Sequence, residues 1–356
     1  MPKAYLVLAD GTVYEGEGFG ASGEAIGELV FTTGMEGYLE TLTDPSYAGQ
    51  IIMQTFPLIG NYGVIEADFE GACHARGYVV RECCDTPSNF RSQGALDAYL
   101  KAQGVPGICG LDTRAITRRI RERGVINAMI CSEIPENLKL LLEYSVRGVV
   151  AAASCKHADV YPSAGETKYR VALIDYGAKR NIVRELQKRG CEVTLLPSSV
   201  SAQKILTMHP DGLMLSNGPG DPEENTYCIA QIAALLGKLP IFGICLGHQM
   251  TALAAGGRTE KMKYGHRGAN QPVKDAEGVR CYITSQNHGY AVVSDSVRAG
   301  KIRYINANDG SCEGIDYPEL NAFTVQFHPE ASAGPHDTAF LFDRFISMMG
   351  GEMQCR

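Results

Sequence analysis

The sequence predicts a two-domain α/β protein in which a mixed α/β domain precedes a doubly wound domain with a parallel sheet. Its 356 residues correspond to about two domains of the usual ~150 residues. In the second half, short apolar runs alternate with helical patterns, which is typical of βαβ units. The first half lacks this alternation. A small, polar stretch between residues 147 and 167 separates the two patterns.

Composition excludes several classes of protein. Hydrophobic residues make up 45% and charged residues 21%, as in an average globular protein. The formal charge of −7 argues against the broad basic surface that non-specific nucleic-acid binding needs. No apolar run approaches the roughly 18 residues of a membrane span, and the N-terminus lacks a signal-peptide pattern. We therefore expect a cytoplasmic protein with no nucleic-acid or membrane partner.

The first domain, expected over residues 1–150, begins with a hairpin. Asp10-Gly11 stands between two apolar runs, which favours a two-residue turn. A Gly-rich stretch at 31–63 predicts structured loops with short strands. Helical patterns follow at 94–103, 113–123 and 136–144. The Arg-rich pattern at 113–123 favours a solvated helix that stops at a glycine, with partner contact as the alternative.

Residues 151–168 are expected to be a linker, and 169–356 the doubly wound domain. Strands are expected at 171–176, 191–197, 211–216 and 240–244, with helices at 179–190, 202–209 and 225–237 between them. In such a domain the active site lies at the carboxyl ends of the strands.

The segment Gly243-Ile244-Cys245-Leu246-Gly247 joins an apolar strand to a helical pattern. Glycines two residues before and after a nucleophile permit the sharp strand-to-helix turn that exposes its side chain. A helix N-terminus beneath the thiol lowers its pKa. Cys245 is therefore the candidate nucleophile, with a buried structural cysteine as the alternative.

A thiolate nucleophile needs a base, and the base needs an orienting group. The strand pattern at 322–327 is followed by His328-Pro329-Glu330. Pro329 favours extended backbone at His328. In extended chain His328 and Glu330 lie on one face, about 6.6 Å apart. The alternative is a surface turn.

A glycine loop supplies a third element. Gly218-Pro219-Gly220 follows the strand pattern at 211–216. Its bare backbone N–H groups suit an oxyanion hole or a ligand carboxylate. Taken alone, the loop is more typical of an ordinary turn.

The remaining cysteines predict no chemistry. The chain has 12 cysteines and no Cys-x-x-Cys pair, which disfavours zinc and iron–sulfur sites. Eleven are interpreted as small buried hydrophobic residues. The chain also lacks a Gly-x4-Gly-Lys-Ser/Thr phosphate loop, so we expect no metal or nucleotide cofactor in it.

The loop GPGDP, the elbow GICLGHQ and the pair HPE resemble, in this order, the class I triad-type glutamine amidotransferases. Three segments narrow the resemblance to the glutaminase small subunits of carbamoyl-phosphate synthetases. They are TTGMEGYLETLTDPSYAGQIIMQTFPLIGNYG (32–63), GLDTRAITRRIRERG (110–124) and DYGAKRNIVREL (175–186). The resemblance covers essentially the whole chain and implies that the second domain is flavodoxin-like.

The resemblance implies roles for individual residues. Cys245 matches the family nucleophile, His328 its base and acid, and Glu330 the orienting carboxylate. The implied glutamine contacts are Ser46, Gly218, Gly220, Leu246, Gln249, Asn287, Gly289 and Tyr290. The family commonly has Phe at the position of Tyr290, a mild change if the backbone makes the contact. His288 invites a catalytic role, but its loop position favours a structural or substrate-affinity role.

The implied reaction is hydrolysis of L-glutamine to glutamate and ammonia. The implied partner is a large synthetase subunit, which carries ATP and Mg²⁺ and makes carbamoyl phosphate from bicarbonate. The first domain is then the expected docking surface. The product serves either arginine or pyrimidine synthesis.

Three alternatives stay open at this point. A stand-alone γ-glutamyl or glutamine hydrolase would use the same triad but leave the first domain unexplained. A non-catalytic regulatory module would be expected to lack one triad residue. A redox protein would need paired cysteines, and adjacent Cys83 and Cys84 are strained as a bridge.

Overall fold

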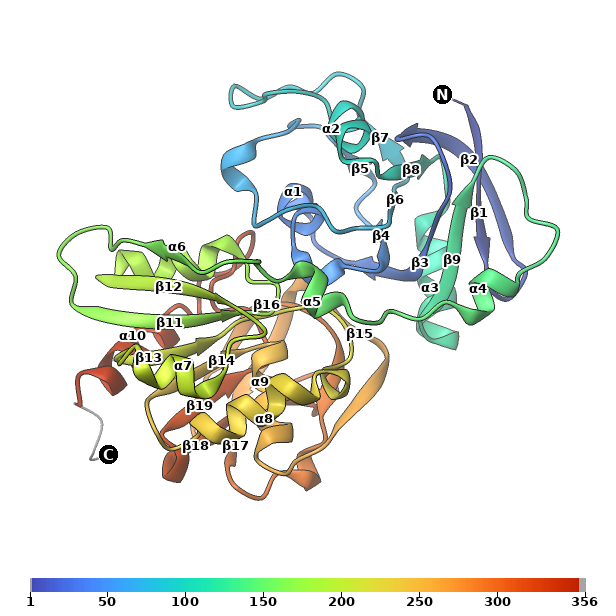
Figure 1. The fold of residues 1–356 in the computed structure, drawn as a ribbon. Coiled ribbons are helices and arrows are strands. Elements are labelled where there is room, and N and C mark those ends of the chain that lie inside the picture. The colour runs from blue at the N-terminus through green and yellow to red at the C-terminus, as the bar shows by residue number, and fades with distance from the viewer. Residues whose placement is uncertain (1, 352–356) are drawn as a thin grey trace. The chain divides into compact units, whose positions relative to one another are not determined.

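The computed structural model describes residues 2–351, and the chain divides into two compact units, Met1–Arg147 and Gly148–Arg356 (Figure 1). The division lies close to residue 150, where the sequence pattern changes. The segment 151–168 contributes to the second unit, because strand β10 (Asp159–Tyr161) pairs with the sheet there. Within the described residues, no helix is both long enough and apolar enough to cross a membrane.

The first unit is a closed barrel with strand order β1-β2-β8-β6-β4-β3-β9. Its strands are β1 (Lys3–Leu8), β2 (Val13–Gly20), β3 (Ala25–Thr32), β4 (Gln50–Gln54), β6 (Gly77–Val79), β8 (Pro106–Cys109) and β9 (Ile126–Cys131). Short strands β5 (Leu58–Ile59) and β7 (Glu82–Cys83) pair separately. The mixed α/β class is confirmed; the closure into a barrel is a feature that the sequence pattern did not predict.

The barrel begins with the hairpin expected at Asp10-Gly11. Strands β1 and β2 pair antiparallel, and Gly11 adopts φ +85° in the turn between them. The helices of this unit are α1 (Tyr38–Leu42), α2 (Leu96–Gln103), α3 (Thr113–Arg123) and α4 (Lys139–Glu143). Helix α4 is shorter than the pattern at 136–144 suggests.

Helix α3 has the predicted bounds. Asp112 caps its N-terminus by accepting a hydrogen bond from the Ala115 N–H, 3.0 Å away. Ile116 and Ile120 are buried, while Arg119 pairs with a surface carboxylate. The helix therefore presents an apolar edge to the barrel and a basic face to solvent.

The second unit is built on a ten-stranded sheet with order β10-β12-β11-β13-β14-β19-β18-β16-β15-β17. The strands besides β10 are β11 (Tyr169–Asp175), β12 (Cys191–Pro197), β13 (Gly212–Leu215), β14 (Ile241–Ile244), β15 (Thr259–Asp275), β16 (Cys281–Val292), β17 (Lys301–Asn306), β18 (Cys312–Tyr317) and β19 (Ala322–Val325). From β12 to β19 neighbouring strands are parallel, and from β19 to β17 they are antiparallel. The doubly wound prediction is confirmed for the parallel half.

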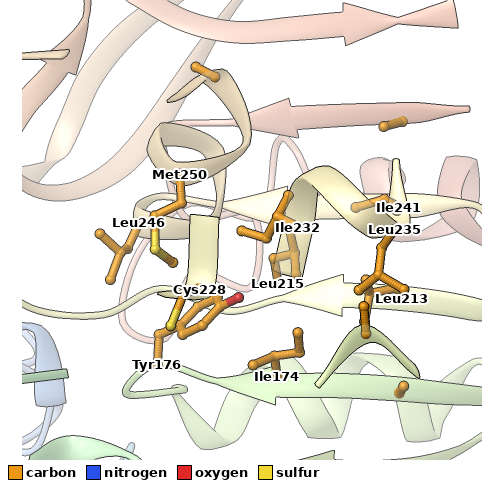
Figure 2. Close-up of a cluster of buried hydrophobic side chains, with 14 of the residues drawn as sticks. Ile174, Tyr176, Leu213, Leu215, Cys228, Ile232, Leu235, Ile241, Leu246 and Met250 are labelled. Carbon is orange, nitrogen blue, oxygen red and sulfur yellow. The ribbon is translucent and has the colours of Figure 1, made fainter. Parts of the chain in front are cut away.

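Helices cover both faces of the parallel half. They are α5 (Val149–Ala153), α6 (Arg180–Lys188), α7 (Ala202–Thr207), α8 (Thr226–Leu235), α9 (Leu246–Ala254) and α10 (Phe340–Met349). Alternate residues of β11 enter two separate cores: Ile174 packs with α7, α8 and α9, and Leu173 packs with α6 and α10. Figure 2 shows the first of these cores, in which Leu246 and Met250 lie near Tyr176. This packing holds the start of α9 against the sheet.

Candidate active site

The nucleophile elbow has the predicted form. Cys245 follows β14 directly and is the N-cap residue of α9, with φ +52° and ψ −103°. A non-glycine residue in this region of backbone space is strained, and such strain is typical of functional sites. A Cβ at Gly247 would lie 2.5 Å from the Leu215 carbonyl oxygen. The glycine therefore permits the close contact of α9 with β13 that places the thiol at the helix N-terminus.

His328 and Glu330 form a buried pair. Their side chains are joined by a hydrogen bond of 2.7 Å between His328 Nδ1 and Glu330 Oε1, and each residue is at most 1% exposed. The backbone differs from the expected extended chain. His328 makes a bridge to Ser285 of β16, and the chain then turns, so that the Ala331 N–H bonds to the His328 carbonyl. The two side chains meet across a turn because the chain reverses, rather than along a strand.

Two residues that sequence reasoning missed contact Glu330, one at its carboxylate and one at its backbone. Lys179 Nζ lies 3.8 Å from Glu330 Oε1 with both side chains buried, and Asn181 donates a hydrogen bond to the Glu330 carbonyl. Burial alone would raise the pKa of Glu330, but the charge and hydrogen bond of His328, together with Lys179, lower it below the ordinary value. Glu330 is therefore ionised and fixes the His328 tautomer with its proton on Nδ1.

The other nitrogen of His328 is available for proton transfer. His328 Nε2 is buried and has no hydrogen-bond partner among the described residues. The Cys245 N–H bonds to the Val325 carbonyl at 2.8 Å, and its Sγ lies 3.7 Å from the carbonyl oxygen of Asn287. The elbow, the end of β19 and strand β16 thus hold the candidate nucleophile, the segment leading to the candidate base, and a backbone acceptor.

The glycine loop lies against the elbow. A Cβ on Gly218 would lie 2.4 Å from the Tyr176 carbonyl oxygen and 2.8 Å from Leu246 Cδ2. Gly220 adopts φ +85°. Residue 218 must therefore be small for the loop to contact Leu246, the first residue of α9. This contact brings together Gly218 and Leu246, two of the predicted glutamine contacts.

Four other predicted glutamine contacts lie around β16. Asn287, Gly289 and Tyr290 belong to that strand, and Gln249 reaches it from α9. Gln249 Nε2 donates to the Tyr290 carbonyl oxygen at 2.8 Å. His288 Nδ1 lies 2.8 Å from the same oxygen. His288 is itself part of β16 and not of a loop as expected, because the strand extends from Cys281 to Val292.

Ser46 belongs to the first unit, in a 3-10 turn (Pro45–Tyr47) capped by Asp44, which accepts from the Ser46 N–H at 2.9 Å. Its contact with glutamine remains a prediction from the resemblance.

One side-chain cluster of the described residues has the spacing of a metal site. His266, His288 and Glu313 are buried, and one ligand atom from each lies within 4.8 Å of the others. They come from β15, β16 and β18, so no local sequence spacing marks them. Glu313 already accepts hydrogen bonds from Asn306 and Gln286, so the cluster is a bonded network as it stands.

The chain is similar to known proteins along nearly its whole length. The family model "Glutamine amidotransferase class-I" matches residues 172–348, and "Carbamoyl-phosphate synthase small chain, CPSase domain" matches residues 6–130. A carbamoyl phosphate synthase small chain of Bacillus caldolyticus is 49% identical over 354 residues, covering 98% of this chain and 96% of the relative. The chain belongs to the carbamoyl-phosphate synthase small chain family.

Two further relatives agree with this family. The small chain of Listeria monocytogenes serotype 4b is 49% identical over 359 residues, with 99% of this chain and 98% of the relative covered. A chain of Bacillus subtilis named pyrimidine-specific small chain is 50% identical over 352 residues, with 98% and 96% covered. The small chain family therefore accounts for both units, including the barrel that other class I amidotransferase sequences would leave unexplained.

Proposed function

We propose that this chain is the glutaminase subunit of a glutamine-dependent carbamoyl-phosphate synthetase and that it hydrolyses L-glutamine through Cys245, His328 and Glu330. The observation that carries the proposal is the buried His328–Glu330 pair, in which His328 Nε2 lacks a partner among the described residues. The pair follows the strand whose Val325 carbonyl accepts from the N–H of Cys245, a strained residue at a helix N-terminus. The names of the relatives support the same role.

In the first half of the reaction, the Cys245 thiol gives its proton to His328 Nε2, and the thiolate attacks the carboxamide carbon of glutamine. The negative oxygen that forms is stabilised by the backbone N–H groups of Leu246 and Gly218. Removal of one such donor typically costs about 3 kcal/mol of transition-state stabilisation. The C–N bond then breaks, His328 returns the proton to the leaving nitrogen, and ammonia and a γ-glutamyl thioester remain.

In the second half, His328 takes a proton from a water molecule that attacks the thioester carbonyl. The C–S bond breaks, the proton returns to the sulfur, and glutamate leaves. Ionised Glu330 stabilises His328 during both intervals in which its ring is positively charged. Residues Gln249, Asn287, Gly289 and Tyr290 are proposed to hold the substrate, together with Ser46 and Gly220.

The ammonia is proposed to pass to a large partner subunit, which carries ATP and Mg²⁺ and uses bicarbonate to make carbamoyl phosphate. Free ammonia is mostly protonated at neutral pH and is then no nucleophile, so an enclosed transfer preserves its reactivity. The first unit is proposed to dock the large subunit. The cysteines of the described residues are free thiols, as is usual for proteins of a reducing cytoplasm.

The test is glutamate release from glutamine by the full chain, with and without the large subunit. Cys245→Ser is expected to abolish release while the complex still forms. Cys228→Ser, which alters another buried thiol of the same unit, is the matched control and should keep full activity. Undiminished release by Cys245→Ser would contradict the mechanism. Rapid release by the chain alone, unaffected by the large subunit, would instead indicate a stand-alone hydrolase.

A further inference from the structure

The connection between β11 and α6, residues 176–179, has all four of its backbone N–H groups bonded to buried side chains. The acceptors are each at most 6% exposed, and the bonds are 2.7–3.0 Å long. The donor–acceptor pairs are Tyr176 to Ser216 Oγ, Gly177 and Ala178 to Asp175 Oδ1, and Lys179 to Asn217 Oδ1. Two of the acceptors follow β13 directly, so the β11–α6 connection is fixed to the end of that strand.

The β11–α6 connection leads to two groups that contact Glu330. Lys179 is the N-cap residue of α6, and its Nζ lies 3.8 Å from Glu330 Oε1. Asn181, in the first turn of α6, donates to the Glu330 carbonyl. Lys179 is only 5% exposed, and a buried charge is costly unless it is paired. A buried N–H also needs an acceptor, so the Asn217 oxygen determines where the backbone of Lys179 lies.

The segment Ser216-Asn217-Gly218 joins the β11–α6 connection to the elbow. The Gly247 N–H, in the first turn of α9, donates to the Ser216 carbonyl at 3.0 Å. The Ser216 hydroxyl donates to the Asn217 carbonyl at 2.7 Å. Gly218, a proposed oxyanion donor, lies so close to the Tyr176 carbonyl oxygen that an added Cβ would be 2.4 Å away. The side chains that hold the connection therefore also adjoin the groups proposed to act on glutamine.

We propose that Asn217 and Asp175 are positioning residues for the triad: they hold the β11–α6 connection so that Lys179 stays beside Glu330. They act through Lys179 on Glu330, and Glu330 acts on His328. The inference rests on the proposed function, because it assigns the connection to the charge state of the proposed base and its partner.

The charges around Glu330 determine the direction of the effect. Among the described residues, the titratable groups that act on Glu330 are His328 and Lys179: burial raises the pKa of Glu330, and these two positive charges lower it below the ordinary value. His288, which interacts with His328, stays neutral because burial lowers its pKa. An ammonium group that moves away from Glu330 therefore raises the pKa of Glu330. Protonated Glu330 no longer stabilises a positive His328, so the acidic limb of the kcat/KM profile moves to higher pH.

A purely structural role for these hydrogen bonds predicts a different result. Gln231 makes the same kind of bond elsewhere in the second unit, since its Oε1 accepts from the Ala202 N–H at the start of α7, 2.8 Å away. Helix α7 carries none of the proposed site residues. Loss of the Gln231 acceptor should lower stability and leave the pH profile unchanged.

The test measures the pH profile of kcat/KM for glutamine and thermal unfolding, using the full chain with its large subunit. Asn217→Ala is expected to lower kcat/KM about 10-fold, as a displacement of less than 1 Å would. Its acidic limb should move to higher pH, by no more than in Lys179→Met. In the Lys179→Met background, Asn217→Ala should move the limb no further, because the group through which Asn217 acts is gone. Gln231→Ala is the matched control.

Asp175 supplies a pair of variants with equal charge. Asp175→Ala and Asp175→Asn both remove the carboxylate, but asparagine keeps one oxygen as an acceptor. That oxygen should face the two N–H groups of the connection rather than the single N–H of Cys155, which bonds to Asp175 Oδ2. The acidic limb of Asp175→Asn should therefore lie closer to that of the wild type than the limb of Asp175→Ala does. Should Asn217→Ala fail to fold, this pair carries the test.

The outcomes separate the two proposals. A folded wild-type complex that releases no glutamate overturns the proposed function. An active wild type whose acidic limb is unmoved in Asn217→Ala overturns the positioning role alone. The positioning role is also overturned if Asn217→Ala moves the limb equally in the wild-type and Lys179→Met backgrounds, if Gln231→Ala moves it as far, or if the two Asp175 variants have the same profile.

Discussion

Replacement of Gly247 by alanine tests whether close packing at the elbow sets the geometry of the nucleophile. The added Cβ would lie 2.5 Å from the Leu215 carbonyl oxygen and 2.8 Å from Leu215 Cβ, whereas real Cβ atoms essentially never come within 3.0 Å. The difference between 3.0 and 2.5 Å requires a displacement of about 0.5 Å. Because Leu215 belongs to the central strand β13, the first turn of α9 is the part that must move.

The displacement moves both the proposed nucleophile, Cys245, and the proposed oxyanion donor, Leu246. Gly247 N–H bonds to the Ser216 carbonyl at 3.0 Å, and the two residues before it are Cys245 and Leu246. A misplacement of 1 Å costs catalysis about 100-fold, so a shift of half that size should lower kcat/KM about 10-fold or more. Overpacking of a core typically costs about 1–3 kcal/mol of stability, which leaves the unit folded at 25 °C.

The assay is glutamate release by the complex, with thermal unfolding measured on the same preparations. Gly165→Ala is the control, since a Cβ at that position meets nothing within 4 Å and it should leave kcat/KM unchanged. If Gly247→Ala retained kcat/KM within about 3-fold of the wild type, the packing of this glycine would not determine the position of the nucleophile.

Two further predictions concern charge. Lys179→Met removes a cation 3.8 Å from Glu330, so the lowered pKa of Glu330 should rise and the acidic limb of the kcat/KM profile should move to higher pH; Lys156→Met, at an exposed site, should leave the profile unchanged. Burial raises the pKa of Glu40 to about 7 in the folded state. A carboxyl group whose pKa is higher in the folded than in the unfolded state stabilises the fold at pH values below its unfolded-state pKa. That contribution is lost as the pH rises through 7. Glu40→Gln should therefore raise Tm at pH 8 and change it little at pH 5, and an equal shift at both pH values would contradict this cause.

Local pattern was enough to predict that Cys245 lies at a strand-to-helix turn. Cys245 lies between two glycines within five residues, and the strand before it and the helix after it are each visible in the sequence. The pairing of His328 with Glu330 was also predicted, but it was expected in an extended chain and is found at a turn. Both conformations can bring the side chains of residues i and i+2 together.

Contacts between distant segments explain what was missed. Asn181 is 149 residues from Glu330 in sequence and donates to its backbone carbonyl, and Lys179 lies near its carboxylate. Neither Asn181 nor Lys179 stands in a sequence pattern that indicates this partner. The Glu313 network combines residues from four strands, and each step of it depends on register in the antiparallel half. The barrel of the first unit was missed because β6 and β8 have only 3 and 4 residues. They pair in parallel with each other, and β8 also pairs antiparallel with the distant strand β2, which periodicity does not indicate.

The sheet of the second unit divides the proposed tasks. The parallel half ends in Cys245, the glycine loop and the segment that leads to His328, so it supplies the groups that exchange protons and carry charge during the reaction. The antiparallel half holds the proposed glutamine contacts Asn287, Gly289 and Tyr290 on β16. Substitutions in the elbow should therefore lower kcat, because they move groups that act in the transition state. Substitutions of the proposed contacts Gln249 and Asn287 should raise KM, because they loosen groups that hold the substrate before and during the reaction alike.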